Sequence, residues 1–270
     1  MNLLRAELRR ALHRRVVRVL VIIAVVGCAL FGVIVWVSSA GKTLAELRAD
    51  NHPALVASWW RQDLPDGVPI VVSLFLFVGA AIAGASVAGA EWRANTVTTM
   101  LTWEPRRLRV LGARLAAAVI VAFVVAVLLQ ALFILAAVPS VIAHGSTSTP
   151  GGGWWWSLTL ALLRMAALTA MIAVMAEALA MLGRNTAFAL VALFGWIAVV
   201  ESVVRGLRPG WARWLWGENL ATVVPWRAMG GDEVFYRGPL TALLTLCTYA
   251  GLIAVAAAVA FHRRDIGASA

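Results

Sequence analysis

The sequence predicts an all-α integral membrane protein with six transmembrane helices. Hydrophobic residues fill 62% of the 270 positions without counting glycine, whereas globular proteins contain about 45–50% with glycine included. Charged residues make up only 13% and gather in short blocks between long uncharged runs. A water-soluble fold could not bury this much apolar surface, so the uncharged runs are expected to cross a bilayer.

Six stretches have the length that a membrane span needs. A bilayer core about 30 Å thick takes about 20 apolar residues in a helix, and helices form because lipid offers the backbone no hydrogen-bond partners. The alternating pattern of a transmembrane β-barrel is absent from the sequence. We expect a single transmembrane domain over residues 1–270, with spans at residues 19–37, 69–90, 115–138, 154–182, 186–204 and 240–261.

The distribution of positive charge predicts the orientation of these spans. A net charge of +10 would suggest nucleic-acid binding in a soluble protein. Here the basic residues flank apolar runs, so anionic lipid headgroups explain them and no nucleic-acid partner is expected. One set of alternate loops carries fourteen Lys and Arg in 54 positions, and the other carries eight in 81. Both termini are therefore predicted to be cytoplasmic.

A basic amphipathic helix is predicted over residues 1–18, before the first span. Apolar residues recur there at helical spacing, while arginine and histidine occupy the other side. Such a helix lies on the cytoplasmic leaflet, either as a topology anchor or as an elbow that transmits movement into the first span. Its apolar positions are Leu4, Leu8, Ala11, Leu12 and Val16.

The loop of residues 91–107, between the second and third spans, is predicted to contain a short cytoplasmic helix. Asn95 or Thr96 can cap its first turn, its apolar residues share one face, and a proline suits the start of the next helix. A solvated connector, or a helix lying on headgroups, is the alternative. The candidate docking residues are Glu91, Trp92, Arg93, Thr96, Val97, Met100, Leu101, Pro105, Arg106 and Arg107.

The same loop carries a resemblance to a known family. It reads Glu-Trp-Arg at 91–93, Thr96, Met-Leu-Thr at 100–102, Pro-Arg-Arg at 105–107 and Val-Leu-Gly-Ala-Arg-Leu at 110–115. This pattern resembles the cytoplasmic loop of type-2 ABC transporter permeases, in which a coupling helix docks on the ATP-binding subunit. Many members have glycine before the threonine, where this chain has Asn95, which also tolerates left-handed backbone geometry. The six-span layout, the amphipathic start and the ending Phe-His-Arg-Arg-Asp-Ile resemble those permeases too.

The resemblance implies a permease subunit of an exporter in a bacterial plasma (inner) membrane. A second copy or a homologue would complete a dimer, and cytosolic ATP-binding-cassette ATPases would drive alternating access of an amphiphilic or apolar substrate. The chain would need no cofactor, because ATP and Mg would bind the ATPase. Its Gly41-Lys42-Thr43 lacks the glycine five positions earlier that a phosphate-binding loop requires. No catalytic or metal-binding set is expected, so the chain is predicted not to be an enzyme.

A stand-alone membrane protein is the alternative function class. A secondary transporter, or an immunity or assembly factor, would work without an ATPase. Secondary transporters usually show central charges, broken helices or internal repeats, and the sequence gives no convincing instance of them. The substrate, the type of dimer and the direction of transport stay open at this stage.

Three ionisable residues fall within predicted spans: Arg164, Glu177 and Glu201. Arg164 and Glu177 lie about 20 Å apart along one helix and cannot pair with each other. Arg164 could meet Glu201, and Glu177 could reach Arg184 or the basic loop that follows the second span. Either these groups pair structurally or they line a substrate path.

Small residues recur in the second span, and a long loop precedes the sixth. Ala80, Gly84 and Ala88 lie four residues apart, a pattern that lets helices approach closely, within one subunit or at a dimer seam.

The loop of residues 205–239 is rich in aromatic and charged residues and predicts short helices at the outer interface. The family resemblance implies an external gate or lid there.

Overall fold

The computed structural model describes residues 3–60, 68–94, 96, 106–226 and 236–263. Within these residues the structure is helical, with no strand and one isolated parallel bridge between Leu55 and Ser146. The prediction of an all-α chain with six spans is confirmed, since six helices are long and apolar enough to cross a membrane. They are Arg15–Ser39, Val72–Arg93, Arg107–His144, Trp154–Gly183, Thr186–Leu207 and Pro239–Arg263.

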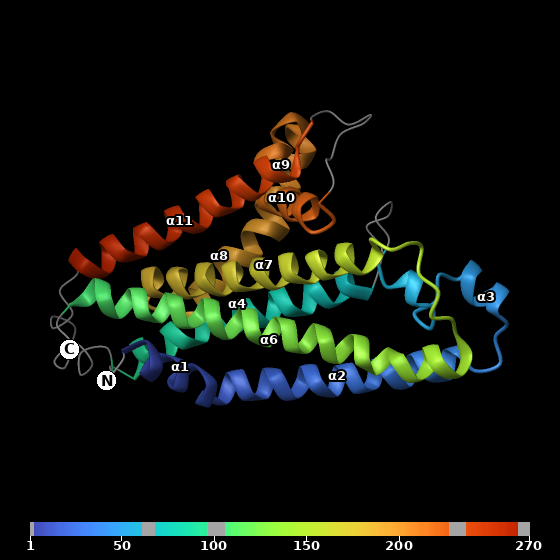
Figure 1. Ribbon diagram of the computed structural model, residues 1–270. Helices are drawn as coiled ribbons and strands as arrows, with labels where there is room; N and C mark the ends of the chain where they lie inside the picture. The colour runs from blue at the N-terminus through green and yellow to red at the C-terminus, as the bar shows by residue number, and fades with distance from the viewer. Residues whose placement is uncertain (1–2, 61–67, 95, 97–105, 227–235, 264–270) are drawn as a thin grey trace.

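The helices form one elongated bundle, with α1 at one end and α3 at the other (Figure 1). The fifth span joins α8, a π-helical turn η2 and α9, and short helices precede or follow several spans. In chain order the elements are α1 (Leu3–His13), α2 (Arg15–Ser39), α3 (Leu44–Ala49), η1 (Val56–Ser58), α4 (Val68–Arg93), α6 (Arg107–His144), α7 (Trp154–Gly183), α8 (Thr186–Gly195), η2 (Trp196–Val200), α9 (Glu201–Leu207), η3 (Pro209–Trp214), α10 (Trp216–Val223) and α11 (Pro239–Arg263).

Helix α7 is the centre of the bundle and packs against α4, α6, α8 and α11. In the apolar windows of α4 and α7, 56% of residues are buried, against 11–17% in the other four spans. Small residues make the α4–α7 contact close: a Cβ on Gly84 would overlap the backbone carbonyl of Ala173. The small-residue face of the second span therefore packs against α7 of the same chain.

The α3 end of the bundle is closed by polar contacts between α2, α6 and the loop that contains α3. The Oγ of Ser38 lies 2.9 Å from Nε2 of His52, and the Oγ of Ser39 lies 3.0 Å from Nδ1 of His144. A capping box between Thr43 and Glu46 starts α3, which satisfies two backbone amides at its first turn. These contacts fix residues 40–60 on the ends of α2 and α6.

Protonation of His52 is expected to loosen this end of the bundle. Its Nδ1 accepts a hydrogen bond from the backbone N–H of Ala54 at 3.1 Å, so the neutral ring fits the site and the cation does not. Burial lowers the pKa of His52 from its ordinary value of 6.5, and Lys42 adds to this effect. Because the folded pKa is the lower one, this stabilisation is present above pH 6.5 and is lost as the pH falls below it.

Hydrogen exchange can measure this loss. The amides of residues 47–58 are expected to lose protection between about pH 7.5 and pH 5.5 after correction for intrinsic rates. A His52→Gln variant should show nearly constant protection over the same range. Equal pH dependence in the variant and the wild type would contradict the role of His52.

Candidate functional site

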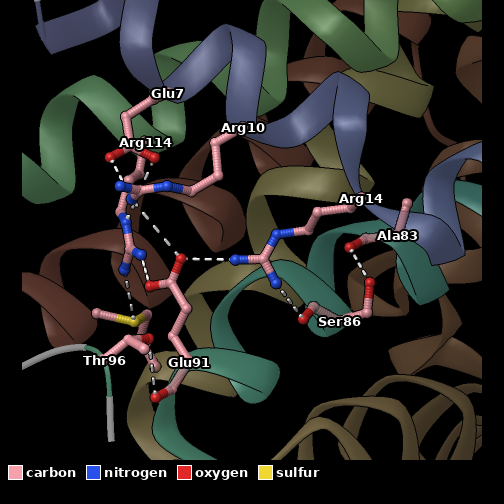
Figure 2. Close-up of polar contacts among 9 residues, drawn as sticks. Glu7, Arg10, Arg14, Ala83, Ser86, Glu91, Thr96 and Arg114 are labelled. Atoms are coloured by element: carbon pink, nitrogen blue, oxygen red, sulfur yellow. Dashed lines mark hydrogen bonds and ion pairs between the residues drawn. The ribbon is translucent and has the colours of Figure 1, made fainter. Parts of the chain in front are cut away.

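Five charged side chains from distant parts of the sequence meet at the α1 end of the bundle. Glu7 and Arg10 lie on α1, Arg14 between α1 and α2, Glu91 near the end of α4, and Arg114 in the first turns of α6. Figure 2 shows their side chains converging between these helices. We call these five residues the charge cluster.

Every member of the charge cluster makes at least one ion pair within it. Arg14 Nη2 lies 2.6 Å from Glu91 Oε1, and Arg114 pairs with Glu91 Oε2. Arg10 Nη1 lies 2.8 Å from Glu7 Oε1 and 3.8 Å from Glu91 Oε1. The Nε of Arg114 lies 3.8 Å from Glu7 Oε2. Glu91 therefore bridges α1, the α1–α2 junction and α6.

The cluster is buried, and its members depend on one another for charge balance. Glu7, Glu91 and Arg114 are 4%, 7% and 2% exposed. An ion removed from water to this degree costs several kcal/mol unless opposite charges and hydrogen bonds replace the water. Burial and the neighbouring Arg10 lower the pKa of Arg14, and the carboxylates of Glu177 and Glu7 counteract them.

A break in the helix at Arg14 brings the N-terminal segment to this position. Arg14 has an extended backbone, with φ −66° and ψ 133°, so α1 and α2 are separate helices. Its Nη1 donates to the carbonyl oxygen of Ser86 on α4 at 3.2 Å. The described part of the segment predicted as one amphipathic helix over residues 1–18 is therefore divided between α1 and the first turn of α2. In α1 the side that faces the protein carries Glu7 and Ala11, whereas Leu12 is 50% exposed.

The described ends of the 91–107 loop are both attached to the bundle. Trp92 stacks under the guanidinium of Arg184, with 4.8 Å between the ring centroid and the Arg184 Cζ. At the other end, Arg107 Nη1 donates to the carbonyl oxygens of Phe261 and His262 in α11, both at 3.3 Å.

Among the other predicted docking residues, Arg93, Thr96 and Arg106 are exposed. The Oγ1 of Thr96 donates to the carbonyl oxygen of Glu91 at 3.5 Å. The predicted cap Asn95 and the predicted docking residues Val97, Met100, Leu101 and Pro105 lie outside the described residues.

Glu201 is held by a helix terminus. Its carboxylate accepts the backbone N–H of Trp216 at 2.6 Å and that of Gly217 at 3.0 and 3.2 Å. These amides form the start of α10, where the helix dipole favours a negative charge. Arg164 lies instead over the ring of Trp226, at 5.3 Å. The two residues proposed to pair with each other therefore have other partners.

Glu177 is the most isolated of the intramembrane charges. It is 1% exposed, and neither carboxylate oxygen has a hydrogen-bond partner among the described residues. The cation that interacts with it most strongly is Arg114, which belongs to the basic segment after the second span. Its other predicted partner, Arg184, is the residue that stacks on Trp92.

The sequence analysis missed Glu7 and Arg114 as site residues. One signal was present: Glu7 is the first acidic residue of the chain, and no other occurs before Glu46. A lone acid within a basic helix indicates a local partner or a buried ion pair. Arg114 had no such signal, because it ends a basic block that the positive-inside rule already explains.

Six apolar helices with largely unburied outer faces decide the class of the chain. It is a multi-pass membrane protein. Comparison with protein-family models and with curated proteins gives no match. The described residues contain no group of three or more His, Cys, Asp or Glu side chains that could hold a metal ion. Among the described residues, the charge cluster is therefore the best-defined candidate site on this membrane protein.

Proposed function

We propose that the chain is the membrane-spanning permease subunit of an ATP-binding-cassette exporter. The observation that carries the proposal is the anchoring of the 91–107 loop. One end is tied through Glu91 to α1 and α6, and the other through Arg107 to α11. A partner that presses on this loop would move several helices together, because buried ion pairs and packed helices shift as units.

In this proposal the α1 end of the bundle faces the cytoplasm. ATP and Mg bind a separate cytosolic ATPase, which docks on the loop and closes on ATP binding. The loop passes this movement to α4 and α6 directly, and to α1 through the ion pairs of Glu91 with Arg10, Arg14 and Arg114. Helix α1 then acts as an elbow at the start of α2. A second permease copy or a homologue completes the path for an amphiphilic or apolar substrate.

Co-purification with candidate ATPases tests this function. A Met100→Asp variant places a charge on the apolar face proposed for docking. It is expected to reduce the amount of bound ATPase at least about tenfold, because an interface that buries an unpaired carboxylate loses more than about 1.4 kcal/mol. The matched control is Leu44→Asp, which makes the same kind of change at a 45% exposed leucine in α3, at the other end of the bundle.

The two variants separate the outcomes. Retention of the ATPase by Leu44→Asp and its loss from Met100→Asp, with both variants monodisperse in detergent, is the expected result. If no cytosolic ATPase binds the wild type, or if Met100→Asp binds it as well as the wild type does, the exporter proposal fails. The stand-alone membrane protein then becomes the better interpretation.

A further inference from the structure

The carboxylate of Glu177 lacks a hydrogen-bond partner among the described residues, whereas every member of the nearby charge cluster makes an ion pair. Its carboxylate is buried in α7, and both oxygens lack hydrogen-bond partners among the described residues. Glu201 is buried to the same degree, yet two backbone amides hold it. Since a buried charge without a partner is costly, Glu177 is either protonated in this conformation or paired with a cation in another one.

Arg114 is placed to be that cation. It is 2% exposed, and its Nη1 donates to the Sδ of Met181 at 3.9 Å. Met181 lies four residues after Glu177 on α7, so the two side chains share one face of the helix. The guanidinium of Arg114 thus already contacts the part of α7 that carries Glu177, while its ion pairs are with Glu91 and Glu7.

We infer that Arg114 exchanges its carboxylate partner, from Glu91 on α4 to Glu177 on α7, when the end of α4 moves. Each conformation then retains a buried ion pair to Arg114, so neither leaves this guanidinium unpaired. Two arrangements with the same number of buried ion pairs can lie close in free energy, which is what a two-state element requires. The exchange would link the end of α4 to the central helix α7.

The cause of the movement of α4 rests on the proposed function, whereas the exchange itself can be tested on the isolated chain. Spin labels are placed at Ala94→Cys, after the end of α4, and at Ala187→Cys, at the start of α8. Double electron–electron resonance then measures the distance between these two labels. Both labelled positions are exposed. The native Cys28 and Cys247 are replaced by alanine in this background.

Weakening the present partner should reveal the second conformation. Glu91→Gln is expected to raise the population of a second distance at least about tenfold, which corresponds to about 1.4 kcal/mol. Adding Glu177→Gln should return the distribution toward the wild type, because the alternative acceptor is lost. Glu177→Gln alone and the control Glu201→Gln should leave the wild-type distribution unchanged.

Three results would overturn the exchange. The first is a Glu91→Gln distribution equal to the wild type, and the second is a second population that persists in Glu91→Gln/Glu177→Gln. If Glu91→Gln fails to fold, Glu91→Asp replaces it, since it keeps the charge but withdraws the carboxylate by one methylene. The third overturning result is then a distance distribution of the Glu91→Asp variant that contains no second population. If the second distance is absent but the ATPase still binds, the exchange fails and the proposed function is retained. If the second distance appears but no ATPase binds, the proposed function fails and the exchange is retained.

Discussion

Replacing Arg114 with alanine is expected to lower the free energy of unfolding by about 3–5 kcal/mol, the usual cost of removing one partner from a buried ion pair. Glu91 would keep Arg14 and Arg10, but Glu7 would retain only Arg10 as a partner in the cluster. The lost side chain is among the largest fully buried ones in the described residues, so a cavity adds to the electrostatic loss. Thermal or denaturant unfolding in detergent micelles measures the change.

Two further variants identify the cause of this loss. Arg5→Ala removes an exposed arginine from α1, the helix that carries Glu7 and Arg10. It is expected to change stability by less than about 0.5 kcal/mol. Arg114→Lys keeps the charge but not the forked geometry of the guanidinium, so an intermediate loss is expected. An Arg114→Ala protein within about 1 kcal/mol of the wild type would show that the buried cluster contributes little to stability.

Replacing Gly84 with alanine is expected to destabilise the bundle by about 3 kcal/mol, the upper end of the range for overpacking a core. The added Cβ would lie 3.0 Å from the carbonyl carbon of Ala173 and would overlap its oxygen. Both atoms belong to the backbone of α7, so no side-chain rotation relieves the contact. Helices α4 and α7 must therefore separate, which weakens the most buried pair of spans.

Gly79 provides the matched control on the same helix. A Cβ at Gly79 meets no atom within 4 Å, so Gly79→Ala should be neutral or stabilising by up to about 1 kcal/mol, the gain in helix propensity. Parallel thermal melts of the two variants should therefore shift in opposite directions, or at least by very different amounts. Equal shifts would mean that close packing at Gly84 does not hold α4 and α7 together.

The spans could be predicted from sequence because lipid imposes one requirement on all of them. Length and apolarity suffice to identify a helix that crosses a bilayer. Each predicted stretch lies within an observed helix or, for the fifth, within the run of α8, η2 and α9, and α6 extends several residues beyond its prediction at both ends. The detail of the first helix could not be predicted in the same way. Periodicity finds an apolar stripe, but in a membrane protein leucine can face lipid while a charged residue such as Glu7 faces the protein.

The partners of the buried charges were beyond sequence reasoning. Glu201 binds backbone amides fifteen residues later in the chain, and backbone amides exist at every non-proline position, so no residue type signals this contact. The π-helical turn before Glu201 also lacks a sequence signal. Arg114 contacts the part of α7 that carries Glu177 only because α6 and α7 pack side by side. Such contacts depend on helix rotation, which apolar composition does not specify.

The central position of α7 also has a consequence for biosynthesis. The ribosome completes α4 at Arg93, but α7 is complete only at Gly183, roughly 90 residues and about 5–18 s later at ordinary elongation rates. During that interval the glycine and alanine face of α4 has no permanent neighbour, and any small-residue helix from another nascent chain could occupy it. The speed of elongation between α4 and α7 is therefore expected to affect correct assembly.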